Sequence, residues 1–431
     1  MRKLIVVISA LSLSAAASAA VHFNVRDFGA KGDGVAKDTA AIQAAVDAAE
    51  SAGGGTVEIP AGTYLTGSIF LKDNVDFHVG AGATLKGSPD KADYNPPDVC
   101  PQNEMLVWPG ESSFGAHLLL CIEKRNVTVR GPGTIDGNSM AFIVDPATGK
   151  EWGFSERLSH GSQSAIPWRP SQMLYFVESS NLRVQDLSLV DSPYWTCFLH
   201  GCTGVAVRGL DIRNRRRPVH THNGDGIDVD CCQFVTISDC RISTADDAIT
   251  LRASGRALKR PQDCAYVTVA NCTLASSCNA VRIGVGERRI HDATFSNIVV
   301  HDSRTAFNFV SSWSRKSRGV DISGIRVQNV RVAGKVSRFF QMHYMYATET
   351  QFSDIVFDGV SGTVCQPSRI YAKRAHPFEN LVFRNVDVPC GFVAVNADVR
   401  VEGGTFAPVA LTPEERAKIE LDVEADRNVI Y

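Results

Sequence analysis

The middle and end of the chain repeat one short pattern of hydrophobic and polar positions. Each copy reads apolar, any residue, apolar, two further residues, apolar, any residue, apolar. Copies start at Leu182, Val205, Val235, Val267, Ala293, Val320 and Leu381. From the first to the sixth start the intervals are 23, 30, 32, 26 and 27 residues. Alternating apolar positions predict strands with one buried face, and the two-residue gap lets the chain turn a corner between strands.

The length of this repeat predicts how the strands associate. One copy cannot bury its own apolar face, so neighbouring copies must stack and pair in parallel. Three short strands and three turns account for a period of about 20 to 30 residues. Hairpin signals such as Asn-Gly, which a sandwich would need, are scarce. We therefore expect an all-β fold, a single-stranded right-handed parallel β-helix, in which Cys240 and Cys272 occupy the same slot of adjacent coils.

A solenoid has two open ends, and the sequence contains a candidate cap for each. Asp38 precedes the alanine-rich segment 39–49, which predicts an N-terminal capping helix, and the glycines 53–55 end it. At the other end, residues 412–415 open a polar helical segment that could close the last coil. No long linker marks a second domain, so residues 20–431 are expected to form a single β-helix domain.

The first nineteen residues resemble a secretory signal peptide. Arg2 and Lys3 precede a mostly apolar run over residues 4–13, and Ala17-Ser18-Ala19 supplies a small-residue cleavage site. The mature protein is therefore expected to start near Ala20 and to be extracytoplasmic, either periplasmic or secreted. No later segment is long and apolar enough to predict stable insertion in a membrane.

Composition narrows the classes of partner. The formal net charge of -2 argues against a nucleic-acid binder. The 12 cysteines contain no CxxC pair, so a structural metal site is not expected, nor is a cofactor. Cys197 and Cys202 could form a local disulfide or remain free as small buried hydrophobic residues. We expect a monomer that acts on a polysaccharide or oligosaccharide, for the reasons that follow.

Two acidic motifs fall on neighbouring coils. One is Asn223-Gly224-Asp225-Gly226-Ile227-Asp228 and the other is Ala245-Asp246-Asp247-Ala248. If about nine residues between 213 and 222 are an insertion, Asp225 takes the same place on its coil as Asp246. The three carboxylates Asp225, Asp246 and Asp247 would then lie on one face, one coil or ~4.8 Å apart.

Crowded carboxylates raise one another's pKa and therefore need a reason. Glycoside hydrolysis provides one, because it uses one carboxyl group as an acid and another as a base. The simpler interpretation is that aspartate and glycine merely populate turns. A single Asp-Gly would favour that interpretation, whereas three carboxylates in register across two coils favour catalysis.

With these motifs, the chain resembles glycoside hydrolase family 28, the polygalacturonase-like pectinases, over nearly all of its mature length. Residues 24–34 and 53–57 are similar to that group's N-terminal segment, and residues 192–195 to its Ser-Pro-x-Trp turn. Asn223-Gly224-Asp225-Gly226 resembles the family's Asn-Thr-Asp-Gly, and Asp246-Asp247 its paired aspartates. The resemblance implies an inverting mechanism in which Asp246 is the general acid. Asp225 and Asp247 would hold and deprotonate the attacking water.

Two departures from the family pattern concern the substrate. Cys278-Asn279-Ala280 replaces a Gly-His-Gly motif, and residues 305–309 replace an Arg-Ile-Lys motif that binds galacturonate. We therefore expect a pectic linkage other than plain homogalacturonan, such as rhamnogalacturonan, with Phe307 and Phe309 packing against a neutral sugar. The expected substrate-binding residues are His222, Asn223, Asn279 and Arg282, aided by the basic segment 213–217.

Two other functions remain open at this point. A polysaccharide lyase on the same fold could use Asp225, Asp246 and Asp247 as a Ca²⁺ cradle, and it would release unsaturated products. A non-catalytic glycan-binding β-helix would hold polysaccharide without cleaving it. Aromatic candidates for sugar stacking are Trp195, Trp313 and Tyr344, although packing within the fold explains each of them more simply.

Overall fold

The computed structural model describes residues 21–96, 99–103, 115–152, 154–155, 163–164, 166–216, 223–312, 318–344 and 350–426. The predicted signal peptide, residues 1–19, lies outside these residues and stays a prediction. Among the helices of the described residues, none has the length and apolar character needed to cross a membrane.

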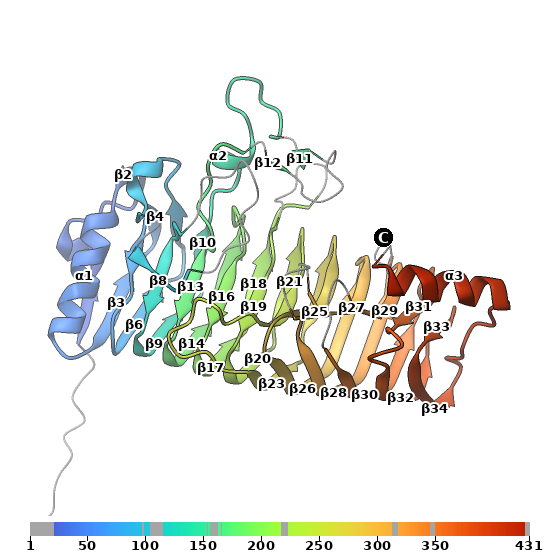
Figure 1. Cartoon of the computed structure of the whole chain (residues 1–431). Helices are drawn as coiled ribbons and strands as arrows, with labels where there is room; N and C mark the ends of the chain where they lie inside the picture. The colour runs from blue at the N-terminus through green and yellow to red at the C-terminus, as the bar shows by residue number, and fades with distance from the viewer. Residues whose placement is uncertain are drawn as a thin grey trace, which may run out of the picture.

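The described chain winds into stacked coils whose strands form long parallel sheets, drawn from end to end in Figure 1. One sheet of eleven strands runs the length of the molecule with every pair parallel. We call it the outer sheet. Its strands are β5 (Ile69–Phe70), β8 (Leu119–Ile122), β13 (Leu174–Val177), β16 (Cys197–His200), β19 (Ile227–Asp230), β22 (Ile249–Ala253), β25 (Asn279–Gly286), β27 (Thr305–Val310), β29 (Arg338–His343), β31 (Ser368–Tyr371) and β33 (Phe392–Val395).

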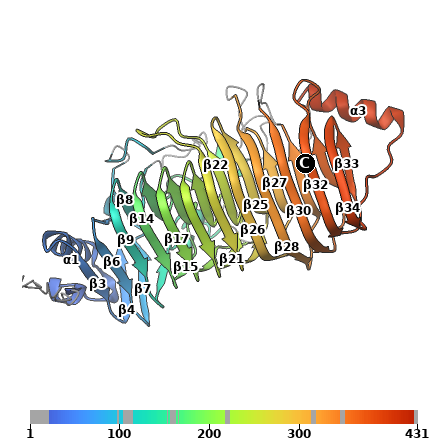
Figure 2. The ribbon, with the colours of Figure 1, turned by 90° about the horizontal axis from the view of Figure 1, so that it is seen from below.

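The rest of each coil belongs to a second sheet of 21 strands, which folds into two columns. The first column contains β1 (His22–Asn24), β3 (Gly55–Ile59), β6 (Val75–Val79), β9 (Arg125–Arg130), β14 (Ser180–Gln185), β17 (Thr203–Arg208), β20 (Gln233–Ser238) and β23 (Cys264–Ala270). The second contains β2 (Asp33–Lys37), β4 (Gly62–Thr66), β7 (Ala83–Gly87), β10 (Thr134–Asp136), β15 (Ser188–Val190), β18 (Asp211–Arg213), β21 (Arg241–Thr244) and β24 (Thr273–Ser276). Later coils continue as β26 (Arg289–His301), β28 (Asp321–Ala333), β30 (Phe352–Gly362), β32 (Phe378–Asp387) and β34 (Ala397–Gly404). Figure 2 shows these strands side by side along the solenoid.

The repeat points inward as expected and forms one continuous core. Leu182 pairs with Val205, Val205 with Val235, and Val235 with Val267, and all four side chains are buried. Because each coil stacks the same apolar position on the next, the buried faces merge along the axis of the solenoid. The parallel β-helix is therefore confirmed.

One repeat was assigned to the wrong register. Ala293 pairs with Ile325, which starts the next copy five residues later than the predicted start at Val320. Val320 is buried as well, so the apolar pattern extends upstream of Ile325. The sequence pattern therefore fits a repeat that begins at either residue. The structure adds a further coil at Ile355, which pairs with Ile325 and Leu381 and is absent from the predicted series.

Helices lie at both ends of the coil stack. Helix α1 (Thr39–Ser51) begins where predicted and buries Ile42 and Val46 on the core. Its N-cap residue Asp38 accepts hydrogen bonds from the backbone of Lys31 and Gly32 instead of capping the helix. Helix α3 (Pro413–Glu424) lies at the far end and begins with the capping box of Thr412 and Glu415. Short helices and a hairpin make up the remainder: η1 (Val25–Phe28), η2 (Lys91–Asp93), α2 (Met140–Ile143), β11 (Phe154–Ser155) and β12 (Gln163–Ser164).

The cysteines are free. All 12 lie among the described residues without a disulfide, which resolves the alternative left open for Cys197 and Cys202. Cys240 and Cys272 occupy the same slot of adjacent coils, one residue before paired Arg241 and Thr273, as the repeat predicted.

Candidate active site

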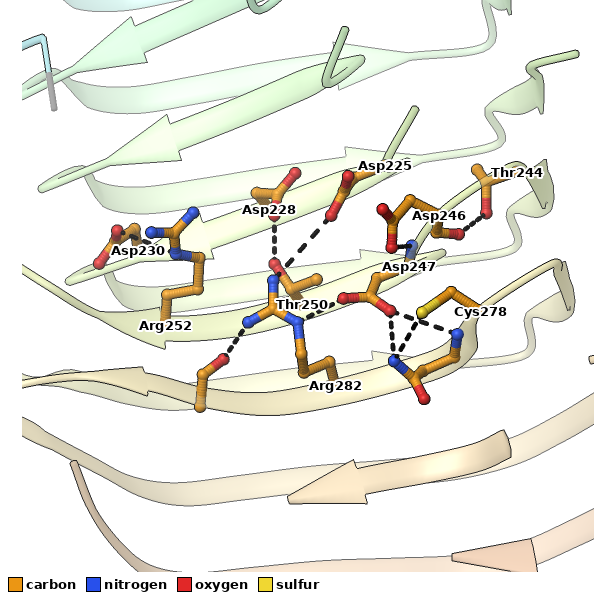
Figure 3. A network of polar contacts seen from close by, with 12 residues as sticks. Asp225, Asp228, Asp230, Thr244, Asp246, Asp247, Thr250, Arg252, Cys278 and Arg282 are labelled. Carbon is orange, nitrogen blue, oxygen red and sulfur yellow. Dashed lines mark hydrogen bonds and ion pairs between the residues drawn. The ribbon is translucent and has the colours of Figure 1, made fainter. Parts of the chain in front are cut away.

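The acidic motifs occupy the corner where the chain enters the outer sheet. Asp225 lies two residues before β19, and Asp246 and Asp247 lie between β21 and β22 (Figure 3). Ile227 pairs with Ile249, and the Gly226 amide donates to the Asp247 carbonyl at 2.9 Å. This register places Asp225 level with Asp247.

The prediction that Asp225 takes the place of Asp246 on its coil is therefore wrong by one residue. Ile212 pairs with Ile242, and Asp225 follows Ile212 by thirteen residues whereas Asp247 follows Ile242 by five. The connection thus contains eight additional residues rather than nine. The three predicted catalytic carboxylates nevertheless lie together at one corner, as Figure 3 shows.

Asp247 is surrounded by donors. Its Oδ1 accepts hydrogen bonds from the Asn279 backbone amide at 3.2 Å and the Asn279 Nδ2 at 2.6 Å. Its Oδ2 forms an ion pair with Arg282 Nε. The side chain is buried, and these donors and the guanidinium provide partners for both of its oxygens, as buried polar groups require.

Asp246 has a different environment. It is half-buried, and burial, followed by the charge of Asp247, raises its pKa to about 6. Its Oδ1 accepts the Asp247 amide at 3.0 Å, and its backbone carbonyl accepts the hydroxyls of Thr244 and Ser276, both at 2.6 Å. These bonds fix the position of a carboxyl group that keeps its proton in mildly acidic solution.

Asp225 lies between these groups. Burial raises its pKa well above the usual range, and the charges of Asp246, Asp228 and Asp247 raise it further. Arg282 opposes this effect, with Nη2 4.0 Å from Asp225 Oδ2. The other oxygen, Oδ1, is buried without a hydrogen-bond partner, so it can accept a proton or a hydrogen bond from a ligand.

A fourth carboxyl group was missed as a site residue. Asp228 is fully buried in β19, accepts a hydrogen bond from Thr250 Oγ1 at 2.5 Å and has its pKa raised to about 7, chiefly by burial. The signal was present in the sequence, because Asp228 alternates with the inward residues Ile227 and Val229 and must face out of the coil beside Asp225.

The predicted binding residues have mixed outcomes. Arg282 binds Asp247 and the Gly284 carbonyl and also faces Asp225, and its role in substrate binding stays a prediction. Asn279 holds Asp247, although its own Oδ1 is buried without a partner. Asn223 lies beside the motif with its Oδ1 3.4 Å from Arg169 Nη2.

In the basic segment 213–217, Arg215 and Arg216 already have partners within the protein, and Arg217 lies outside the described residues. Arg215 forms an ion pair with Asp191 at 2.7 Å, and Arg216 donates to the Asp302 carbonyl at 2.6 Å. The expected binding residue His222 lies outside the described residues, as do the rest of 217–222 and Trp313.

The expectation that Phe307 and Phe309 pack against a sugar is wrong. Both side chains are fully buried inside the coil, where Phe307 lies edge-on to Phe295 and Phe339. Their alternation in β27 turns Asn308 outward instead. Trp195 is also buried, beneath the Arg252 guanidinium at 4.7 Å from its ring centroid.

The donor set does not suit a metal ion. Asp246, Asp247 and Cys278 bring ligand atoms within 4.8 Å of one another. The Cys278 thiol, however, accepts a hydrogen bond from Arg304 Nη2 at 2.7 Å, and burial raises its pKa, which favours the neutral thiol over the thiolate that binds metals. Arg282 in turn contacts both Asp247 and Asp225, so a guanidinium already occupies two of the three carboxylates that a Ca²⁺ cradle would use.

Solved structures share the fold of this chain. The hyperthermoactive exopolygalacturonase from Thermotoga maritima matches with a TM-score of 0.70 and 19% identity, covering 90% of this chain and 91% of that one. The family 28 exopolygalacturonase of Yersinia enterocolitica matches with a TM-score of 0.69 and 22% identity, covering 91% and 76%. The chain is thus a parallel β-helix protein with a carboxylate cluster on its outer sheet.

The sequence comparison is more specific. Residues 56–400 match the model of Glycosyl hydrolases family 28, and the chain belongs to that family. A probable polygalacturonase of Vitis vinifera is 27% identical over 256 residues, 57% of this chain and 47% of the relative. An exo-poly-alpha-D-galacturonosidase of Dickeya chrysanthemi is 37% identical over 131 residues, 28% of this chain and 20% of the relative. The chain therefore spans less than half the length of these curated relatives.

Proposed function

We propose that the protein hydrolyses O-glycosidic bonds in a pectic, uronic-acid-containing polysaccharide. The observation that carries this proposal is the difference between two adjacent carboxyl groups. Asp246 is half-buried with a pKa of about 6, whereas donors and a guanidinium surround Asp247. Two neighbouring carboxyl groups in such different environments can serve as the acid and the base of a glycosidase. Family membership and the activities named for the two polygalacturonase-type relatives agree with this reaction type.

In this mechanism Asp246 donates its proton to the glycosidic oxygen as the bond to the leaving sugar breaks. A water molecule between Asp225 and Asp247 attacks the anomeric carbon and gives its proton to one of these two carboxylates. Arg282 holds Asp247 in place and offsets part of the negative charge of the pair. The reaction then ends with Asp246 ionised and one proton on the Asp225–Asp247 pair.

We further propose that the anomeric configuration inverts. Both oxygens of Asp247 already accept hydrogen bonds, which weakens this group as a nucleophile. Asp225 instead has one buried oxygen without a partner, suited to a water molecule. A base that acts through water leads to inversion, whereas a carboxylate that attacks carbon leads to retention.

The preferred linkage is proposed to differ from plain homogalacturonan. A uronate carboxylate at the cleavage position requires a cationic partner, because a charge is costly to remove from water. Asn279 and Asn308 are neutral amides, and Arg282 is already bound to two carboxylates. A neutral sugar such as rhamnose at one side of the cleaved bond meets these residues without an unpaired charge.

The test is to incubate the protein with polygalacturonate, rhamnogalacturonan and branched pectic fragments and to measure new reducing ends. Proton NMR of the first product formed reports its anomeric configuration, which should be opposite to that of the substrate. Unsaturated products would instead indicate a lyase, and tight binding without new reducing ends would indicate a glycan-binding protein. Polygalacturonate as the best substrate by tenfold or more in kcat/KM would contradict the proposed linkage.

An extracytoplasmic location and a monomeric state are also proposed. The location rests on the signal-like residues 1–19, and it accords with a polymeric substrate that does not enter cells. Mature protein should appear in the periplasm or medium with Ala20 at its N-terminus. Light scattering should give the mass of one chain.

A further inference from the structure

Three arginines gather on the outer sheet beyond the catalytic coils. Arg338 begins β29 and pairs with Thr305, and Arg304 lies one residue before β27. Arg369, in β31, pairs with Gln341. Burial lowers the pKa of Arg338 to about 10, and the nearby charges of Arg369 and Arg304 contribute to this shift. Arg338 is therefore close enough to both of the other guanidinium groups to be repelled by them.

Arg338 has no acidic partner among the described residues. Its side chain is 8% exposed. Nε donates to the Pro367 carbonyl at 2.8 Å and Nη2 to Gln366 Oε1 at 2.6 Å, and both acceptors are neutral. A buried cation without a carboxylate is costly, and like charges beside it increase the cost. An anion supplied by a ligand would remove that cost.

Buried polar groups beside the arginines also lack partners. Gln341 is 3% exposed with its Oε1 unbonded, and His343 is 1% exposed with both ring nitrogens unbonded. Both residues alternate with inward Phe340 and Met342 in β29, so they face the same side of the outer sheet as Arg369. Such groups are suited to the hydroxyls of a sugar, which both donate and accept hydrogen bonds.

This cluster is aligned with the catalytic residues. The register runs from Asp247 to Asn279, then to Thr305 and to Arg338. Three coils of about 4.8 Å place Arg338 roughly 14 Å from Asp247 along the sheet. A second row, which faces outward, runs beside it from Arg282 to Asn308, Gln341 and Arg369. A polysaccharide lying along the outer sheet can therefore contact both sites at once.

We propose that Arg338, assisted by Arg304 and Arg369, binds the carboxylate of a uronic acid residue located a few sugars from the cleaved bond. The planar guanidinium of Arg338 suits bidentate recognition of a carboxylate. The inference rests on the proposed function. The added point is that the uronate is recognised away from the carboxyl cluster. An acidic polymer can then be bound although Asn279 and Asn308 at the cleavage position are neutral amides.

Binding is measured separately from cleavage to test this subsite. Calorimetry is performed with trigalacturonate and with its carboxyl-reduced neutral counterpart, using the Asp246→Asn protein to prevent turnover. We expect trigalacturonate to bind at least tenfold more tightly than the neutral trisaccharide. Adding Arg338→Gln should remove most of this preference, and Arg338→Lys should retain part of it. The matched control is Arg326→Gln, which changes an arginine on β28 of the other sheet.

The possible outcomes distinguish this inference from the proposed function. Equal binding of the two trisaccharides, no binding of either, or an undiminished preference in the Arg338→Gln protein overturns the subsite. Thermal unfolding provides the folding check: loss of an unpaired cation should leave Tm unchanged or higher. A lower Tm together with weakened binding of both trisaccharides would mean a structural role and would also overturn the subsite. Failure of the proposed hydrolysis would instead appear as absence of new reducing ends with the carboxylate preference intact.

Discussion

Replacing Asp228 with asparagine should stabilise the protein at neutral and alkaline pH. The side chain is fully buried with a pKa raised to about 7, whereas an aspartate in an unfolded chain has a pKa of about 3.9. The folded state therefore binds a proton more tightly than the unfolded state. The free energy of unfolding therefore falls as the pH rises from about 4 to 7. Above pH 7 the folded state bears the whole cost of ionising this buried carboxyl group.

The size of the effect follows from the two pKa values. A difference of about 3 pKa units at 1.36 kcal/mol each gives an upper limit of about 4 kcal/mol above pH 7. With an unfolding entropy of about 2.1 cal/mol/K per residue, this corresponds to a rise in Tm of roughly 5 °C for a chain of this length. Asparagine keeps the oxygen that accepts the Thr250 hydroxyl, so the substitution mainly removes the charge.

The assay is thermal unfolding of the wild type and Asp228→Asn proteins at pH 4.5, 6 and 8. The two Tm values should agree within about 1 °C at pH 4.5, where the wild-type carboxyl is already protonated, and should diverge as the pH rises. Asp398→Asn, which changes an exposed aspartate, provides the control. A variant that is less stable than the wild type at pH 8, or a difference independent of pH, would refute the reasoning.

The remaining predictions concern catalysis and packing. Asp246→Asn should lower turnover by about 10² to 10⁴ with little change in Tm, and near-normal turnover would exclude it as the general acid. In the wild type, kcat/KM should fall above pH 6 as Asp246 loses its proton, and this alkaline limb should be absent from the residual activity of Asp246→Asn. Arg282→Met should destabilise by about 3 to 5 kcal/mol because it leaves buried carboxylates unpaired, and the added change Asp247→Asn should restore part of this loss in unfolding measurements. Phe307→Ala should also cost about 3 to 5 kcal/mol while leaving KM unchanged, whereas a selective rise in KM would show that the ring contacts sugar.

The sequence by itself determined the solenoid and three of the four carboxyl groups at the candidate site. The inward series from Leu182 to Leu381 requires stacking, because each copy exposes an apolar face that only another copy can cover. Asp225, Asp246 and Asp247 were identifiable because aspartates recur beside corresponding corners of neighbouring coils.

Tertiary structure decided the details that depend on pairing between distant strands. A one-residue change in register moved Asp225 from the level of Asp246 to that of Asp247, and local sequence could not fix the length of the insertion that sets this register. The same two-residue alternation placed Phe307 inside the coil and Asn308 outside. Arg282 pairs with Asp247 for a related reason. The charge of a side chain is a property of the sequence, but which opposite charge it meets is set by the coil stacked beside it.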